Sequence, residues 1–396
     1  MVVIRRAQSI VTDEVISMRR YLLATCLVVS MAMSAAAVSL CDYQSPLTDL
    51  SALDLGFYYR YYRDPFGFED QHINQGTFLI DYLRLFDAPE YGFDIAFQNE
   101  LRVNILDADD STYTLRADGN YKRYVQFETD SFAFAGAQVR SASGSQGIAL
   151  SLSLGVGTGR FTDVTPMAKA VRIEEVLAQR GALQNEEDKQ PRELHPVDLQ
   201  EVAAAIRNAA TYETQAELLA RIQTILESSG VVRLGGLDAQ DMFEVTRVLQ
   251  SGGMTRYCGW DLKAGLGYEL LSPSDEENDL LVMGAFNFAL ASTPREQILF
   301  TGLFSGAVDV INRHQLDINA SYDYVIFDFL SARAAYAFIR ETWGGNPNHT
   351  HRIAVDLLMQ PADIASVILS LVMQSEEHYT LGWSIDLKLS IEMSVL

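Results

Sequence analysis

The C-terminal stretch from Leu381 to Val395 alternates strictly between apolar and polar side chains. The odd positions carry Leu381, Trp383, Ile385, Leu387, Leu389, Ile391, Met393 and Val395. The even positions carry Gly382, Ser384, Asp386, Lys388, Ser390, Glu392 and Ser394. Because successive side chains of a β-strand point to opposite faces, one face of this strand is apolar and the other is small, polar or charged. Alternation over about 15 residues fits a tilted strand that crosses a membrane better than a strand of a soluble sheet.

The same alternation recurs along the chain and predicts a mainly β fold, an antiparallel transmembrane β-barrel of about 14 strands. One misassigned hairpin would make the number about 12 or 16, since such barrels keep an even number. Both faces carry apolar residues in 279–291, 297–309 and 362–374, so the pattern is weakest there. We expect strands at 54–63, 76–86, 91–105, 111–125, 130–141, 146–159, 257–271, 279–292, 297–309, 313–325, 328–341, 349–360, 363–374 and 379–395.

This pattern resembles bacterial outer-membrane β-barrel proteins, and the resemblance covers nearly the whole mature chain. It is a resemblance of alternation, with no residue motif. One departure concerns the last residue, which in that family is usually an aromatic on the lipid-facing parity. Here Leu396 falls on the polar parity and Val395 takes the outward place. The resemblance implies a porin-like protein of the bacterial outer membrane, in contact with lipid and lipopolysaccharide.

Connection lengths indicate which end of the barrel faces outward. The connections after odd-numbered strands include the longer segments 63–75, 272–278 and 342–348, and those after even-numbered strands include the short turns 87–90 and 126–129. Outer-membrane barrels have longer outer loops and short inner turns. Tyrosine and tryptophan near strand ends resemble the aromatic girdles of such barrels. They are Tyr91, Tyr124, Tyr257, Trp260, Trp343, Tyr379 and Trp383. A soluble β-sandwich interrupted by helices is the alternative fold.

The N-terminus reads as a signal peptide over residues 1–37. Arg19 and Arg20 precede an apolar run that ends in small residues at Ala37, which is the order of a secretory signal. Met18 is a second candidate for the true start. Lipidation of Cys41 is the alternative, although Leu40 stands where lipoprotein signals carry a small residue. Cys41 and Cys258 would lie at the same end of the barrel, where a disulfide could form, but we expect both to be unpaired.

Residues 161–255 form an insert between the first part of the barrel, 42–160, and the second part, 256–396. From Thr165 the apolar period changes from two to 3.6, which predicts amphipathic helices. The first helix is expected to start at Thr165-Pro166 with a hydroxyl cap and to end at Gly181. Further helices begin near Pro196, before Leu218 and at Asp238. Because the insert follows the sixth strand, it should lie in the periplasm, either as a bundle stable by itself or as the docking domain for a periplasmic protein or the cell wall.

The polar faces of the strands carry charges of both signs, and these would line the lumen. The candidates are Asp81, Asp94, Glu100, Arg102, Arg116, Asp118, Lys122, Asp261, Lys263, Glu269, Asp317, Asp323, Arg333, Asp356, Asp386, Lys388 and Glu392. One interpretation is a water-filled pore for ions or small solutes, weakly favouring cations because acidic groups prevail. The other is a network of cross-strand pairs that fills a closed lumen. The sequence leaves both open.

Other chemistry finds little support in the sequence. With 52 acidic and 30 basic residues, the chain is unsuited to nucleic acid. The acidic outer loops, including 107–110 and 275–279, match no calcium-loop spacing and suggest a solvated rim. His349 and His351 would face the membrane. An outer-membrane hydrolase is the rival class, but no serine or carboxylate has a histidine partner fixed by local sequence. We expect no catalytic residue, metal or cofactor.

Overall fold

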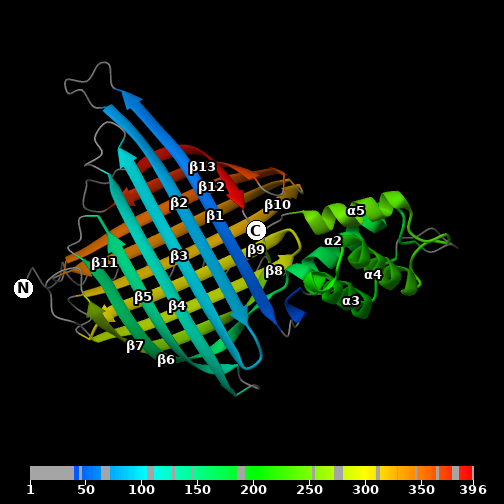
Figure 1. Ribbon diagram of the computed structural model, residues 1–396, viewed down its shortest axis with the longest axis horizontal. Coiled ribbons are helices and arrows are strands. Elements are labelled where there is room, and N and C mark those ends of the chain that lie inside the picture. Colours follow the sequence, from blue (N-terminus) through cyan, green and yellow to red (C-terminus); the bar gives the residue numbers. More distant parts are fainter. Residues whose placement is uncertain are drawn as a thin grey trace, which may run out of the picture. The chain divides into compact units, whose positions relative to one another are not determined.

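The computed structural model is a closed β-barrel with four α-helices inserted between its sixth and seventh strands (Figure 1). It describes residues 40–43, 47–63, 72–104, 111–126, 130–143, 147–184, 192–251, 255–271, 280–308, 313–327, 329–343, 346–362, 365–376 and 383–394. The expected signal peptide, the acidic loop residues 107–110 and 275–279, and Tyr379 lie outside these residues. No helix among the described residues is long and apolar enough to cross a membrane.

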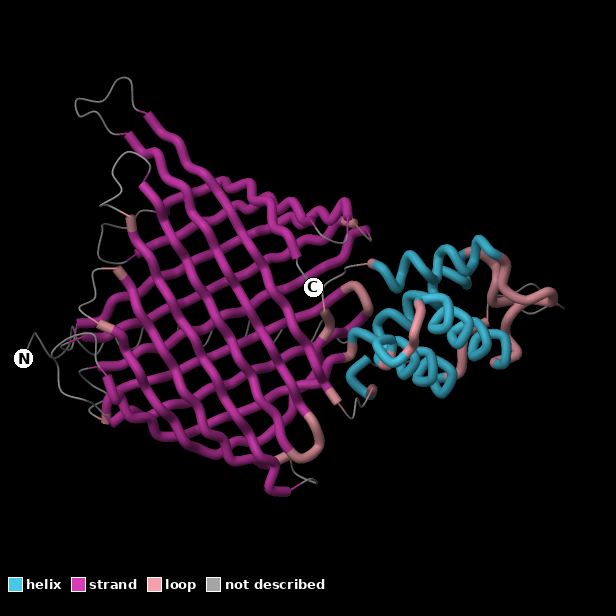
Figure 2. Tube along the Cα trace, viewed as in Figure 1, coloured by secondary structure: helices cyan, strands magenta, loops and turns pink. Residues whose placement is uncertain are grey.

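Fourteen antiparallel strands follow one another around the barrel in chain order, and β1 closes the sheet against β14. The strands form the barrel wall, and the helices are grouped apart from it (Figure 2). The closure pairs residues 54–57 with 391–394. The first half consists of β1 Thr48–Arg63, β2 His72–Asp87, β3 Tyr91–Asn104, β4 Thr112–Gln126, β5 Ser131–Ala142 and β6 Ile148–Asp163. The second half consists of β7 Tyr257–Leu271, β8 Leu280–Thr293, β9 Glu296–Ala307, β10 Arg313–Phe327, β11 Leu330–Trp343, β12 Asn346–Ala362, β13 Ala365–Glu376 and β14 Trp383–Ser394. The predicted fold class and strand number are confirmed.

The helices form a small bundle with its own apolar core. They are α2 Thr165–Gln179, α3 Pro196–Arg207, α4 Gln215–Ser228 and α5 Ala239–Gln250, with a short 3-10 turn η3 Ala209–Thr211 after α3. Ile173, Leu177, Val202, Ile222 and Val248 are fully buried between them. This core stabilises helices that are too short to persist alone in water.

The caps of these helices fit the sequence with one exception. Thr165 was expected to cap α2, but its backbone N–H donates to the Asp163 carboxylate at 2.8 Å. Its hydroxyl instead accepts from the Arg256 backbone N–H at 2.8 Å, across the neck that joins helices and barrel. Asp238 makes a complete capping box at the start of α5, and the N–H of Gln240 and the N–H of Asp241 donate to its carboxylate. These N–H donors lower the pKa of Asp238.

A disulfide between Cys41 and Cys258 fastens the start of the described chain to β7. Cys41 lies in a 3-10 turn, η1 Leu40–Asp42, and Cys258 is the second residue of β7. The expectation of unpaired cysteines is therefore wrong. The same sulfur cannot carry both a disulfide and a lipid thioether, so this pairing also contradicts the lipoprotein alternative. Tyr43 extends the tie, because the Arg207 guanidinium of α3 donates to its hydroxyl at 3.3 Å.

Candidate functional site: the barrel lumen

The ladder register decides which side chains face the lumen. Phe57 of β1 and Phe78 of β2 are paired, exposed and in ring contact at 4.8 Å, so they mark the outer face. Side chains alternate between the two faces of a strand. The strand pairing, followed around the barrel from these two residues, therefore tells which residues of each strand face inward. The outer face carries exposed apolar residues on strands all around the barrel, such as Ile95 of β3, Leu154 of β6, Leu266 of β7 and Val355 of β12. This apolar band and the closed ladder define an outer-membrane-type β-barrel, since only a closed sheet satisfies its backbone in lipid.

The predicted lumen residues with described side chains all fall on the inner face. They are Asp81 of β2, Asp94, Glu100 and Arg102 of β3, Arg116, Asp118 and Lys122 of β4, Asp261, Lys263 and Glu269 of β7, Asp317 and Asp323 of β10, Arg333 of β11 and Asp356 of β12. Asp386, Lys388 and Glu392 pair in register with Val372, Ser370 and Ser366, and their side chains lie outside the described part.

A belt of charges lines the lumen near the end opposite the helices. The Arg116 guanidinium donates to Asp118 at 2.6 Å, and the Gln138 amide donates to the same carboxylate. Arg140 of β5 is electrostatically coupled to Arg116, Asp118, Glu269 and Asp317, the last from five strands away on β10. The carboxylates of Glu269 on β7 and Asp317 on β10 therefore interact electrostatically with the Arg140 guanidinium on β5.

The same belt contains further ties between neighbouring walls. Arg313 of β10 forms an ion pair with Glu269 of β7 at 3.2 Å, so this bond spans three strands. The Gln315 amide donates to Asp317 at 3.0 Å. The Glu100–Arg102 ion pair lies at the same level on β3. Arg140, Arg313 and Gln138 were not predicted: Arg313 begins its strand, and 130–141 has small residues on both faces that obscure the alternation.

At mid-height, polar side chains tie β3 to β7. Asp94 accepts from the Asn120 amide at 2.7 Å, and the Lys263 ammonium lies 3.8 Å from the same carboxylate. The Asn287 amide donates to Asp261 at 2.7 Å. The wall between these strands is rich in glycine: a Cβ on Gly155 would come within 2.6 Å of the Phe134 ring. The glycine therefore makes room for an aromatic ring that lies against the inner wall.

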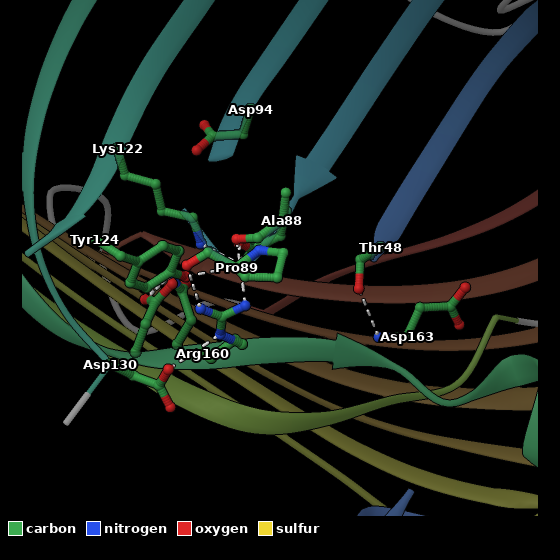
Figure 3. A network of polar contacts seen from close by, with 12 residues as sticks. Thr48, Ala88, Pro89, Asp94, Lys122, Tyr124, Asp130, Arg160 and Asp163 are labelled. Atoms are coloured by element: carbon green, nitrogen blue, oxygen red, sulfur yellow. Dashed lines mark hydrogen bonds and ion pairs between the residues drawn. The ribbon is translucent and has the colours of Figure 1, made fainter. Parts of the chain in front are cut away.

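A buried ion pair braces the helical end of the lumen (Figure 3). The Lys122 ammonium donates to Asp87 at 2.6 Å, and both side chains are almost fully buried. The Tyr124 hydroxyl donates to the same carboxylate at 3.0 Å, and the Arg160 guanidinium stacks on the Tyr124 ring at 4.1 Å. Arg160 also contacts Asp130 at 3.2 Å. Tyr124 is therefore part of this inner brace, and its expected place in a membrane girdle is wrong.

The remaining predicted girdle residues fall in different places. Tyr91 and Trp260 are exposed on the outer face, as expected. Tyr257 packs against Phe161 at the neck, with ring centroids 6.4 Å apart. The side chains of Trp343 and Trp383 lie outside the described part.

Part of the lumen stays open to solvent. Asp81 and Gln98 are exposed although both face inward, and Leu83 keeps 42 % of its surface exposed on the same inner wall. The inner face is not uniformly polar, because β8 and β9 contribute Met283 and Leu303 to it. These are the strands whose sequence carried apolar residues on both faces. The inner wall therefore combines charged and apolar stretches around accessible space.

His314, His349 and His351 contact aromatic and hydroxyl side chains of β11. His351 contacts Tyr336 and Phe338 of β11 on the outer face, with its Nδ1 2.9 Å from the Tyr336 hydroxyl. His349 stacks on Phe338 at 5.9 Å. His314 lies 3.1 Å from the Thr342 hydroxyl. No group of three or more potential metal ligands occurs among the described residues.

Comparison with known proteins adds little beyond the fold. No protein-family model and no curated protein matches the chain. The solved structure of the CymD monoaromatic hydrocarbon channel aligns with a TM-score of 0.30 and 9% identity, covering 89% of this chain and 88% of that one. A bacterial polysaccharide outer-membrane secretin aligns with a TM-score of 0.28 and 8% identity, over 87% and 97%. OpdQ of Pseudomonas aeruginosa gives 0.27 and 8%, over 87% and 96%. Similarity this weak carries no argument about a solute.

Proposed function

We propose that this barrel lies in the outer membrane of a Gram-negative bacterium and passes ions or small solutes through its lumen without catalysis. The observation that carries the proposal is the solvent exposure of inward-facing residues at mid-strand, namely Asp81, Leu83 and Gln98. A 14-stranded barrel is wider than the eight-stranded kind that side chains alone can fill. The charge belt then lines the path and sets its selectivity.

The helical insert lies in the periplasm in this proposal. Both α2 and α5 connect to the barrel at the strand ends where the other connections are short turns, such as Ala88–Glu90 between β2 and β3. Protease added to intact cells should therefore leave the insert uncut. Protease admitted through a permeabilised outer membrane should release it. Cleavage in intact cells would reverse the orientation.

The pore is tested in planar lipid bilayers with purified, folded protein. We expect stepwise conductance with a mild preference for cations, because carboxylates outnumber cationic groups on the described inner face. Asp317→Lys, in the belt, should shift the preference toward anions. Glu201→Lys, on the exposed side of α3, is the matched control and should leave it unchanged. Absence of conductance from correctly inserted protein would refute the pore.

A docking role for the helical insert is the second candidate. Val197, Leu234 and Phe243 are 64%, 84% and 64% exposed, and in this proposal they would contact the partner. The partner class is a periplasmic protein or the cell wall. Cosedimentation with purified peptidoglycan tests the latter, with Phe243→Ser expected to weaken it. Equal sedimentation of both proteins would argue against this surface.

A further inference from the structure

A cleft of about 500 Å³ lies where the helices meet the rim of the barrel. Its helical side is formed by α2 and α5, including Val176 and Arg247. Its barrel side is formed by Arg295 in the turn between β8 and β9, and by Phe327 and Phe329 around the turn between β10 and β11. The cleft is separate from the lumen, because these residues belong to turns and helices outside the inner wall.

The cleft is basic in a chain of net charge −22. Arg172, Arg247 and Arg295 line it, and none of its lining residues is acidic. Arg247 keeps a partly exposed ion pair with Glu244 at 2.7 Å. Arg172 adds to the positive charge of the buried Arg256, whose guanidinium donates to the carbonyl oxygens of Pro294 and Arg295. Burial lowers the pKa of Arg256, Asp323 opposes that shift, and the repulsion from Arg172 lowers the pKa further.

The apolar part of the cleft consists of aromatic rings at the end of β10. Phe327 and Phe329 stack with ring centroids 5.7 Å apart, and both are more than half exposed. On the outer face of β10, Tyr322 and Tyr324 are also exposed just before them. Aromatic side chains gather where acyl chains give way to headgroups. In a membrane whose boundary follows these aromatic residues, the arginines of the cleft would lie near the headgroups and the rings would lie near the acyl chains.

We propose that this cleft binds an anionic glycerophospholipid of the leaflet on the helical side. The phosphodiester would accept hydrogen bonds from Arg247 and Arg295, with Arg172 adding charge, because guanidinium groups match phosphate oxygens. An acyl chain would lie on the Phe327 and Phe329 rings. An acidic chain repels anionic lipid elsewhere, so a local basic cleft is needed to hold one. A bound lipid would also join the helical insert to the barrel rim.

The test measures lipid binding to the delipidated full-length protein in neutral detergent, by native mass spectrometry. The probes are phosphatidylglycerol, diacylglycerol and soluble glycerol phosphate. We expect phosphatidylglycerol to bind best, and Arg295→Gln or Arg247→Gln to weaken it about tenfold each, the loss of one charge-assisted hydrogen bond. Phe329→Ser should weaken it as well. Arg221→Gln, an exposed arginine of α4 outside the cleft, is the matched control and should bind normally.

Three results would overturn the proposal. Diacylglycerol binding as tightly as phosphatidylglycerol would show that the phosphate does not contribute to recognition. Glycerol phosphate binding as tightly as phosphatidylglycerol would show that the acyl chain does not contribute to recognition. Equal losses in Arg221→Gln and Arg295→Gln would show a general charge effect. All variants keep the barrel core, and heat-dependent gel migration verifies that each is folded. The proposal does not depend on conductance, so a silent bilayer would leave this test valid.

Discussion

Ile80 and Leu83 of β2 allow a direct test of a wet lumen. Both are apolar and similarly exposed, at 37% and 42%, yet the register places Ile80 on the outer face and Leu83 on the inner face. Ile80 is next to the middle of the strand His72–Asp87. With a rise of about 3.3 Å per residue and a tilt of about 40°, Leu83 is roughly 9 Å from that middle, still within an apolar band about 25 Å tall.

Ile80→Arg should cost about 2–4 kcal/mol of unfolding free energy, because it places a guanidinium in lipid near the midplane. Leu83→Arg should cost well under 1 kcal/mol, because the new charge meets lumen water and the Asp81 carboxylate two residues away. A difference of about 2 kcal/mol corresponds to about a 30-fold change in the folding equilibrium.

The measurement is reversible unfolding by denaturant from lipid vesicles, followed by tryptophan fluorescence. Wild type and both variants are compared at the same lipid-to-protein ratio. If Leu83→Arg destabilises the barrel as much as Ile80→Arg, the lumen at this height is dry and the pore proposal loses its main support. If Leu83→Arg alone is costly, the face assignment itself is reversed.

Three further predictions concern stability. Asp87→Ala should lower the free energy of unfolding by about 3–5 kcal/mol, because it leaves the buried Lys122 ammonium without this carboxylate. Asp49→Ala, which breaks an exposed ion pair, should lower it by about 0–1 kcal/mol. Unfolding from vesicles distinguishes the two variants, and equal losses would contradict the brace. Cys258→Ser should lower stability by about 2–4 kcal/mol, and a free thiol in the oxidised wild type, detected by thiol titration, would contradict the disulfide. Replacing residues 169–252 by a Gly/Ser linker should leave a heat-modifiable barrel, and loss of the gel shift would show that the helices brace the wall.

The sequence predicted strands wherever one face is uniformly apolar. The expected strand 257–271 coincides with β7, Tyr257–Leu271. The first strand was expected from residue 54 but begins at Thr48. Leu50 and Leu53 have opposite parity in the sequence, so the alternation breaks before residue 54, although the backbone continues to pair with β2 as far as Asp87. Backbone pairing with β2 therefore extends β1 beyond the residues that the alternation predicts.

The face of a lumen residue was predictable, but its partner was not. Parity alone places Asp94 and Lys263 inside. Their approach depends on the register of four successive strand pairs and on how sharply the wall between them curves, which no local pattern records. The Cys41–Cys258 disulfide is a similar case, because it joins residues 217 positions apart in the chain. Contacts of this kind depend on the closed barrel. Local sequence determines only which residues face the lumen and could pair there.

The described inner face has features of both interpretations of the lumen, the open pore and the interior filled by charge pairs. Among the described residues, ion pairs join β3 to β7 and β7 to β10, where Asp94 meets Lys263 and Glu269 meets Arg313. Asp81 and Leu83 on β2 stay exposed on the remaining side. In the proposed pore, a solute would pass along the exposed side of the lumen, against a charged wall that resists collapse because its members are paired. The cross-strand network and the open path are therefore compatible: the first holds the wall apart, and the second is the space that it leaves.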